Sequence, residues 1–232
     1  MSSNVFEEQG IQFKVITPEM YEDVMDFLWT HFFADEPVTQ SLGVKRLGFV
    51  DKYMFPDAFR QNCSMVALDR SGNLLAVRVG HIKTRDGWTA WLMDRLFQVL
   101  PFSLLSTWWP SLAKLPILVK LLRTIDYNVW TKFDLWNCHS VYEGLAVCSA
   151  RTHGVRGLGT EIVRRCDDIA REAGCSYTYI LATGNYSRRI FSGLGYRHLN
   201  TLTYAEFRDE QGELYLKKTK EHIAATTWLK TL

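Results

Sequence analysis

The sequence predicts an α/β fold. In the second half of the chain, an apolar strand over residues 141–148 is followed by a glycine-rich turn, a helix over 157–173 and another strand over 177–182. Such alternation is typical of a sheet with parallel neighbouring strands. In the first half, apolar runs over 64–68 and 74–81 flank a turn-forming segment, which predicts an antiparallel hairpin. Helices are therefore expected on a sheet that contains both kinds of strand pair.

The remaining elements complete this pattern. Alternating residues over 13–16 predict a short strand, and Thr17-Pro18-Glu19 supplies a cap, a first-turn proline and an acidic first turn for a helix to about Phe33. Residues 88–135 are expected to be helical, residues 186–194 form another expected helix, and the last thirty or so residues hold two strands.

Length and composition favour one globular domain over residues 1–232. The 232-residue chain is 47% apolar and 22% charged, with a net charge of +2, so it can bury a core and is not of the disordered class. The expected helical region at 88–135 is an insertion that covers the substrate. Scattered basic residues give no strong field for nucleic acid, and the run Lys217-Lys218-Thr219-Lys220 is interpreted as a solvated face.

Cysteine and histidine spacing argues against a metal centre. The five cysteines contain no CxxC pair, so neither zinc nor a disulfide framework is indicated, and the six histidines show no metal-ligand spacing. A reducing compartment fits this usage. Residues 1–10 lack the basic start and apolar stretch of a secretory signal, so a cytoplasmic location is expected. The protein is also expected to be a monomer.

An apolar segment over residues 96–122 approaches the length of a membrane span. Pro101, Pro110 and Pro116 divide it into pieces of about two turns, and Lys114 places a charge at its middle. Short helices packed over a core are expected in its place. Trp108 and Trp109, together with Trp130, either pack in that core or wall an apolar pocket.

The most informative stretch runs from Leu145 to Val163, where a strand enters a glycine-rich turn that opens a helix. Gly157 and Gly159 let a bulky anion approach, and the backbone amides from Arg156 to Thr160, aided by the helix dipole, can hold a pyrophosphate. The side chains of Arg151, His153 and Arg156 can add positive charge. The alternative is that the glycines serve close packing of helix on sheet.

Two segments resemble the GNAT superfamily of acetyl-coenzyme A-dependent acetyltransferases. Gly154-Val-Arg-Gly157-Leu-Gly159 matches its Arg/Gln-x-x-Gly-x-Gly/Ala loop, except that Gly154 replaces the basic or amide residue, and residues 180–196 match its closing strand, helix and Gly-aromatic end. A Rossmann dinucleotide turn is disfavoured, because no acidic residue ends a strand about twenty residues later. The resemblance implies the GNAT fold, a mixed, largely antiparallel sheet flanked by helices. It also implies acetyl-coenzyme A contacts at Leu145, Ala146, Val147, His153, Gly154, Val155, Arg156, Gly157, Leu158, Gly159, Thr160 and Ser187.

The first half of the chain resembles one family within GNAT. Phe32-Phe33-Ala-Asp35-Glu36-Pro37 is similar to the Phe-Phe-x-Asp-Glu-Pro signature of insect arylalkylamine N-acetyltransferases, and Thr183-Gly-Asn-Tyr186-Ser187 is similar to their Ser-x-x-Tyr-Ser segment. This resemblance implies acetyl transfer from acetyl-coenzyme A, without a metal, to a small primary amine of the dopamine, serotonin, tryptamine or tyramine class.

The resemblance assigns catalytic roles. Freeing the lone pair of an alkylamine at pH 7 costs about 4 to 5 kcal/mol, so a base is needed, and Glu36 is the candidate. The alternative for Glu36 is a solvated helix end. Asp35 is expected to position the amine.

The departing thiolate needs help from another residue, because Phe191 stands where many GNAT enzymes have a proton-donating tyrosine. Ser187, four residues earlier on the same helix face, is the candidate, although it is equally suited to starting the helix. Thr183 and Tyr186 are candidates to hold water or the amine, with a buried, hydrogen-bonded tyrosine as the alternative for Tyr186. Backbone N–H groups near Val147 are expected to meet the thioester oxygen. Proximity makes a cysteine nucleophile unnecessary, so Cys148 is expected to pack.

Two further functions remain open. One is the same chemistry on a polyamine or agmatine, for which few carboxylates cluster in the central segment. The other is a protein of this fold that binds acyl-coenzyme A without turnover.

Overall fold

The computed structural model describes residues 3–44, 46, 55, 57–84, 115–125, 138–150 and 155–232. Most of the expected helical insertion at 88–135 lies outside these residues, apart from one helix. The following positions discussed above also lie outside the described residues: Pro101, Trp108, Trp109, Pro110, Lys114, Trp130, Arg151, His153 and Gly154.

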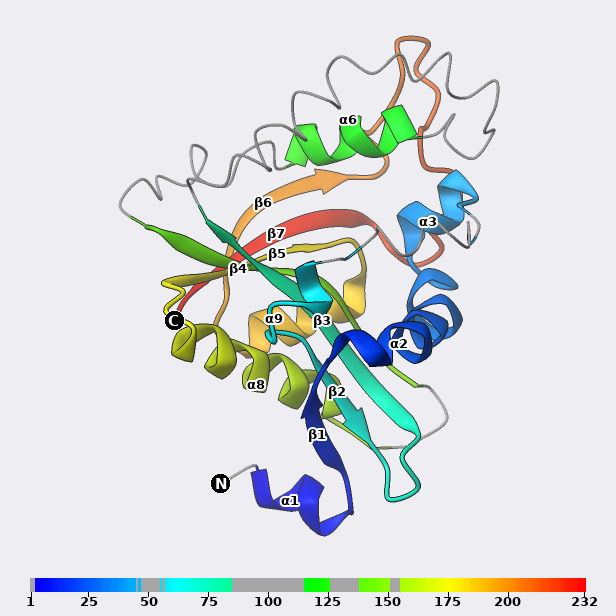
Figure 1. The fold of residues 1–232 in the computed structure, drawn as a ribbon. Coiled ribbons are helices and arrows are strands. Elements are labelled where there is room, and N and C mark those ends of the chain that lie inside the picture. Colours follow the sequence, from blue (N-terminus) through cyan, green and yellow to red (C-terminus); the bar gives the residue numbers. More distant parts are fainter. Residues whose placement is uncertain are drawn as a thin grey trace.

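Seven strands form one sheet in the order β1-β2-β3-β4-β5-β7-β6. Their bounds are β1 Gln12–Val15, β2 Met65–Leu68, β3 Leu74–Thr84, β4 Ser140–Ser149, β5 Tyr177–Ala182, β6 Arg197–Thr203 and β7 Ala224–Thr231. Among these strands β4 and β5 are parallel, and each other neighbouring pair is antiparallel. The predicted mixed, largely antiparallel sheet is therefore confirmed, and Figure 1 shows it twisting across the molecule.

The end of the chain departs from the prediction. β6 begins at Arg197, before the last thirty or so residues, and β7 inserts between β5 and β6. The strand that follows the last helix is thus not a parallel neighbour of β5. A connection over residues 204–223 joins β6 to β7, and it includes an isolated bridge between Arg208 and Leu214.

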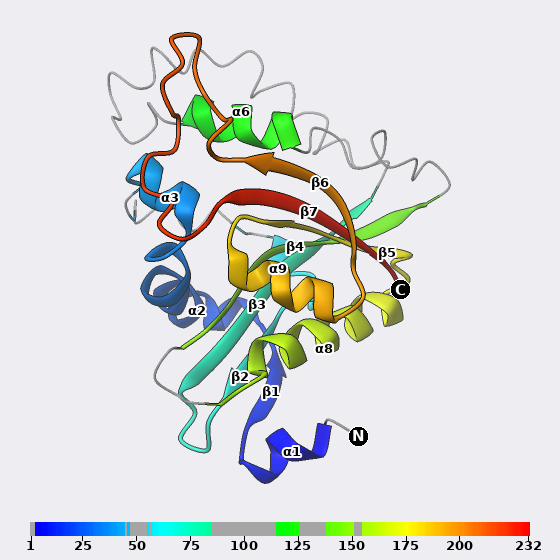
Figure 2. The same ribbon diagram turned by 180° about the vertical axis from the view of Figure 1, so that it is seen from behind.

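The helices cover both faces of the sheet. Their bounds are α1 Ser3–Glu8, η1 Pro18–Met20, α2 Tyr21–Leu28, η2 Trp29–Phe33, α3 Pro37–Leu42, η4 Asp57–Phe59, α6 Leu115–Ile125, α8 Leu158–Glu172 and α9 Asn185–Gly193. Comparison of Figures 1 and 2 shows α2 on one face and α8 with α9 on the other. The helix expected after Thr17 is present as a 3-10 turn, an α-helix and a π turn in succession.

Alternation along β3 builds a core on each face. Val77 and Val79 pack with α2, whereas Ala76 packs with α8. Arg78 occupies the same strand between these valines, and its side chain lies beside Tyr142 and Phe191, on the α8 and α9 face.

A third apolar cluster fixes the outer edge of the sheet. It joins α3, α6, the connection over 204–223 and β7, and it contains Val38, Leu42, Leu121, Ile125, Tyr204, Phe207, Leu216 and Ala225. Figure 1 shows α6 lying over β6. The cluster matters for the site described below, because it holds the start of α3 beside the sheet.

No helix in the described part of the chain has the length and apolar character of a membrane span.

A cluster of three polar side chains, His81, Lys83 and Glu143, joins β3 and β4. His81 lies opposite Glu143, and the Glu143 carboxylate contacts His81 Nε2 at 2.9 Å and Lys83 Nζ at 2.6 Å. Burial raises the pKa of Glu143, but Lys83 and then His81 outweigh burial and lower it to about 2.

We expect Glu143→Gln to lower the free energy of unfolding by about 3 kcal/mol at pH 7. A carboxyl with a depressed pKa stabilises the fold above its unfolded pKa, and that contribution is lost as the pH falls toward about 2. The difference between wild type and variant should therefore shrink from pH 7 to pH 3 in urea unfolding followed by circular dichroism. An equal difference at both pH values would contradict this account of Glu143.

Candidate active site

A pocket opens where β4 and β5 stop pairing. The two strands pair in parallel from Val141 opposite Tyr177 to Gly144 opposite Ile180, and β4 continues beyond that point to Ser149. The cavity there has a volume of about 730 Å³. Its walls come from η2 and the start of α3, from β3, β4 and β5, from α9, and from residues 220–222.

β4 carries a bulge at this opening. Val79 pairs with Ala146 and Gly80 pairs with Gly144, so Leu145 is an extra residue on β4. A bulge bends a strand and redirects its groups. Leu145, Ala146 and Val147 all line the pocket, which brings together three of the residues expected to contact the coenzyme.

The N-terminus of α8 lies at the other end of this edge of β4. Gly157 adopts a left-handed φ of 80° and caps the helix, a conformation that favours glycine. The first backbone N–H groups of the helix have no intrahelical partner, so the expected anion site over Arg156, Leu158 and Thr160 has suitable donors. Gly159 lines the pocket, and a Cβ there would lie 3.2 Å from Ile190 Cδ1 on α9. Gly159 therefore also allows close packing of α8 on α9.

Val155 and Leu158 are two further residues that were expected to contact the coenzyme. Val155 lies just before the turn and packs against the α8 core cluster, and the Leu158 side chain is buried in the same cluster. The buried Leu158 can therefore offer only backbone groups to a ligand, whereas Val155 is partly buried.

Glu36 lies at the start of a helix, where it caps α3. Its Oε1 accepts the Val38 N–H at 3.1 Å and its Oε2 accepts the Thr39 N–H at 2.6 Å. The helix end is not simply solvated, because Glu36 is partly buried and lines the pocket. Each carboxylate oxygen has a second lone pair that can accept a proton or an ammonium group. Pro37 occupies the first turn, where its missing N–H costs nothing.

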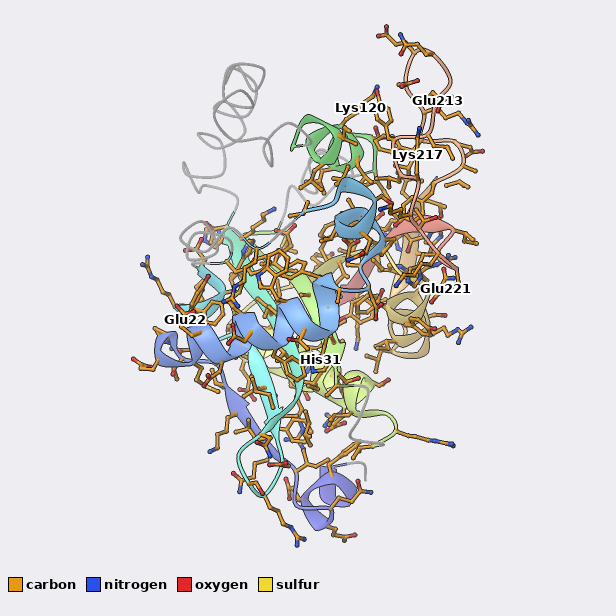
Figure 3. The ribbon with its side chains drawn as sticks, turned by 90° about the vertical axis from the view of Figure 1, so that its right-hand side faces the viewer. Glu22, His31, Lys120, Glu213, Lys217 and Glu221 are labelled. Atoms are coloured by element: carbon orange, nitrogen blue, oxygen red, sulfur yellow. The ribbon has the colours of Figure 1, made fainter. Side chains whose placement is uncertain are left out.

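Asp35 is held by a residue distant in sequence. Its Oδ1 lies 3.0 Å from Lys220 Nζ, and both side chains line the pocket. Lys220 is exposed, as expected for a solvated basic face, but it also pairs with Asp35 at the pocket, which the sequence did not predict. The solvated-face interpretation holds for Lys217, which pairs with Glu213 on the exposed outer part of the connection in Figure 3.

Tyr186 and His222 border the pocket at the start of α9. Tyr186 is 63% exposed and donates a hydrogen bond to Glu221 Oε1 at 3.3 Å, so the buried-tyrosine interpretation is wrong. His222 is buried, and its Nδ1 accepts the Asn185 N–H at 3.1 Å. The two rings meet edge to face with centroids 5.9 Å apart. Sequence reasoning missed His222, because only the β6–β7 connection brings it to the site.

Ser187 and Thr183 line the same pocket. The Ser187 hydroxyl donates to the Gly184 carbonyl at 3.0 Å within the first turn of α9, which agrees with a role in starting the helix. The Thr183 carbonyl accepts from Tyr204 Oη at 2.6 Å. Burial, and then the nearby Glu36 carboxylate, raise the pKa of Tyr204, so its phenol stays protonated.

Phe191 and Cys148 are pocket residues without acid-base capacity. Phe191 is fully buried and packs against Tyr196. Burial raises the pKa of the Cys148 thiol, which therefore stays neutral. Within the described residues, no group of three histidine, cysteine or acidic side chains is placed to hold a metal ion.

Arg78 is a further pocket residue that the sequence did not identify. It is 1% exposed, and within the described part of the chain its Nε and Nη2 have no hydrogen-bond partner. The available signal was a single arginine inside an apolar strand.

The architecture is similar to that of several solved N-acetyltransferase structures. No family model matches the sequence. Arylalkylamine N-acetyltransferase 2 from Aedes aegypti is similar, with a TM-score of 0.77 at 21% identity over 95% of this chain and 98% of that one. Polyamine N-acetyltransferase from Drosophila melanogaster, described as forming N-acetylagmatine, gives 0.73 at 20% over 96% and 100%. An agmatine N-acetyltransferase gives 0.75 at 21% over 96% and 100%. The chain therefore has the GNAT fold that these N-acetyltransferases share.

Proposed function

We propose that the protein transfers the acetyl group of acetyl-coenzyme A to the primary amine of a small arylalkylamine. One observation carries this proposal: a single pocket extends along the free edge of β4 to the capped carboxylate of Glu36, beside the N-terminus of α8. Acyl transfer needs a phosphate site, a channel for the thioester arm and a base, and this pocket supplies residue types suited to all three. The sequence resemblance and the shared fold point to the same chemistry.

The coenzyme fits the shape of the site. The N–H groups at the start of α8 suit a pyrophosphate. The edge of β4 from Ser149 to Leu145 has no β5 partner, so its backbone groups can pair with the amides of the pantetheine arm. The thioester then lies near the bulge, where N–H groups around Val147 can meet the charge that develops on the carbonyl oxygen.

The reaction is a direct attack of the amine on the thioester. The amine first loses a proton to Glu36, directly or through a water molecule, and its nitrogen then bonds to the carbonyl carbon. The C–S bond breaks and the sulfur leaves with the electron pair. The helix cap fixes the orientation of the Glu36 carboxylate at the pocket wall, and positioning supplies much of the rate.

Charge and shape at the acceptor end favour an amine with one cationic group. Aromatic rings of His31, Phe32, Tyr186 and His222 line the pocket. The Asp35 carboxylate already pairs with Lys220, whose ammonium would repel a second positive charge. The polyamine or agmatine alternative rests on Glu221, a half-exposed carboxylate in the pocket wall.

We expect Glu36→Gln to lower kcat/KM for tyramine by about 10²-fold or more, because the amide cannot accept the amine proton. The single amide oxygen can accept only one of the two N–H groups that the carboxylate caps, so we expect a loss of about 1 kcal/mol in stability, and activity is compared well below the melting temperature of the variant. Glu213→Gln, on the exposed connection outside the pocket, is the matched control and should retain full activity. Equal activity of Glu36→Gln and wild type would exclude Glu36 as the base.

Lys220→Gln tests the preference for singly charged amines. Removing the ammonium removes the positive charge that would repel the second cation of agmatine, so the ratio of kcat/KM for agmatine to that for tyramine should rise by about twofold to fivefold for a half-exposed pair. Lys217→Gln, on the same connection but paired with Glu213, should leave the ratio unchanged. A wild-type enzyme that already prefers agmatine or spermidine would move the acceptor assignment to polyamines. Tight acetyl-coenzyme A binding without turnover of any amine would favour a silent binding protein.

A further inference from the structure

Arg78 stands out among the pocket residues because its charge is buried and poorly paired. Its side chain is 1% exposed, and its Nε and Nη2 find no hydrogen-bond partner among the described residues. Arginine stays protonated in proteins, and a buried cation is costly unless an anion or several acceptors compensate it. A side chain of this kind next to a cavity points to a ligand with negative charge.

The guanidinium lies at the point where β4 and β5 separate. A Cβ at Gly144 would lie 1.8 Å from Arg78 Nη2, so only glycine leaves room for the side chain there. Gly144 is the last residue of β4 that pairs with β5. The guanidinium carbon also lies 5.8 Å from the centre of the Tyr142 ring and 5.7 Å from that of Phe191.

The groups around the guanidinium leave a net positive charge. Burial keeps the pKa of Tyr142 and Tyr196 above the usual range and raises that of Cys166 to about 12, so all three are neutral at pH 7. The nearby Asp167 carboxylate pairs with Lys230 Nζ at 2.9 Å. The positive charges of Arg78 and Lys230 therefore lie near the single negative charge of Asp167.

Asp167 has little capacity left for Arg78. Besides Lys230, its carboxylate accepts hydrogen bonds from Tyr196 Oη and Thr178 Oγ1. The guanidinium instead has ring faces on two sides, and Arg78 lines the cavity.

Position along α8 selects the part of the coenzyme that Arg78 meets. Arg78 interacts with Cys166 and Asp167, which follow the first residue of α8, Leu158, by eight and nine positions, and at about 1.5 Å per residue this is roughly 12 Å. A phosphate bound at the start of α8 is therefore out of reach of Arg78. An extended pantetheine arm covers a similar length, so its sulfur is the anionic centre that reaches the guanidinium.

Resting on the function proposed above, we infer that Arg78 stabilises the coenzyme A thiolate as it leaves. When the C–S bond breaks, the sulfur takes the electron pair and the Arg78 cation balances its charge, while the amine proton passes to Glu36 or water. The thiolate then takes a proton from solvent. This assignment explains how Phe191, which has no proton to give, can occupy the wall beside the sulfur.

The test is the thiol pKa of bound coenzyme A, which needs no amine substrate. Isothermal titration of wild type with coenzyme A and with S-methyl-coenzyme A is compared between pH 6 and pH 10. An opposite charge lowers a thiol pKa by at least about one unit, so affinity for coenzyme A should rise at least about tenfold relative to the S-methyl analogue. Arg78→Met should reduce this gain to less than about twofold, and Arg78→Lys should retain part of it.

Arg165→Met is the matched control, because Arg165 pairs with Glu161 and stacks on Phe13 away from the cavity. It should show the wild-type gain. A purely structural role for Arg78 predicts the same gain in Arg78→Met as in wild type, and that result would overturn the inference. If Arg78→Met does not fold, wild type alone decides, since no pH-dependent gain over the S-methyl analogue would also overturn it.

The same titrations separate this inference from the proposed function. Failure of wild type to bind either coenzyme would contradict the proposed function itself. Binding without a lowered thiol pKa would overturn the role of Arg78 alone.

Discussion

The end of β4–β5 pairing at Gly144 and Ile180 is the constraint on which the site depends. Parallel strands that stayed paired to the end of β4 would use its backbone groups within the sheet and close the cavity. Because pairing stops, Leu145 to Ser149 keep an edge that faces the pocket. The bulge at Leu145 and the guanidinium over Gly144 both lie at this point, so the separation of the strands and the chemistry proposed for it share the same residues.

Segments far apart in the sequence complete the site around this opening. α3 brings Glu36 to it, and the apolar cluster shared with α6 and β7 holds α3 in place. The connection between β6 and β7 brings Lys220 to Asp35 and His222 to the first turn of α9. This end of the pocket, which holds the amine in the proposed function, is therefore built from loops and helix ends that lie far apart in the sequence.

Local signals in the sequence predicted most of the fold. The strand over Tyr177–Ala182, the hairpin of β2 and β3 and the helix after the glycine turn were all predicted from apolar patterns, turns and caps. The place of β7 between β5 and β6 was not predicted, because strand order depends on tertiary packing. In the site, the resemblance located Glu36 and the β4 edge. It gave no means to find His222, Lys220 or Arg78, whose positions depend on long-range contacts.

Some residues combine a packing or capping role with a place in the pocket wall. Glu36 caps a helix and faces the cavity, and Gly159 permits both helix contact and access to the pocket. A sequence pattern cannot separate such roles, because both need the same residue type.

The most direct test of the account is the stoichiometry of acetyl transfer by the wild-type protein. The protein is mixed with acetyl-coenzyme A and tyramine, tryptamine, dopamine or serotonin, and released coenzyme A is compared with the N-acetylated amine measured by mass spectrometry. We expect multiple turnovers that form equal amounts of coenzyme A and N-acetylarylalkylamine. Release of coenzyme A without amide, or no release with any of these amines while acetyl-coenzyme A binds, would contradict it.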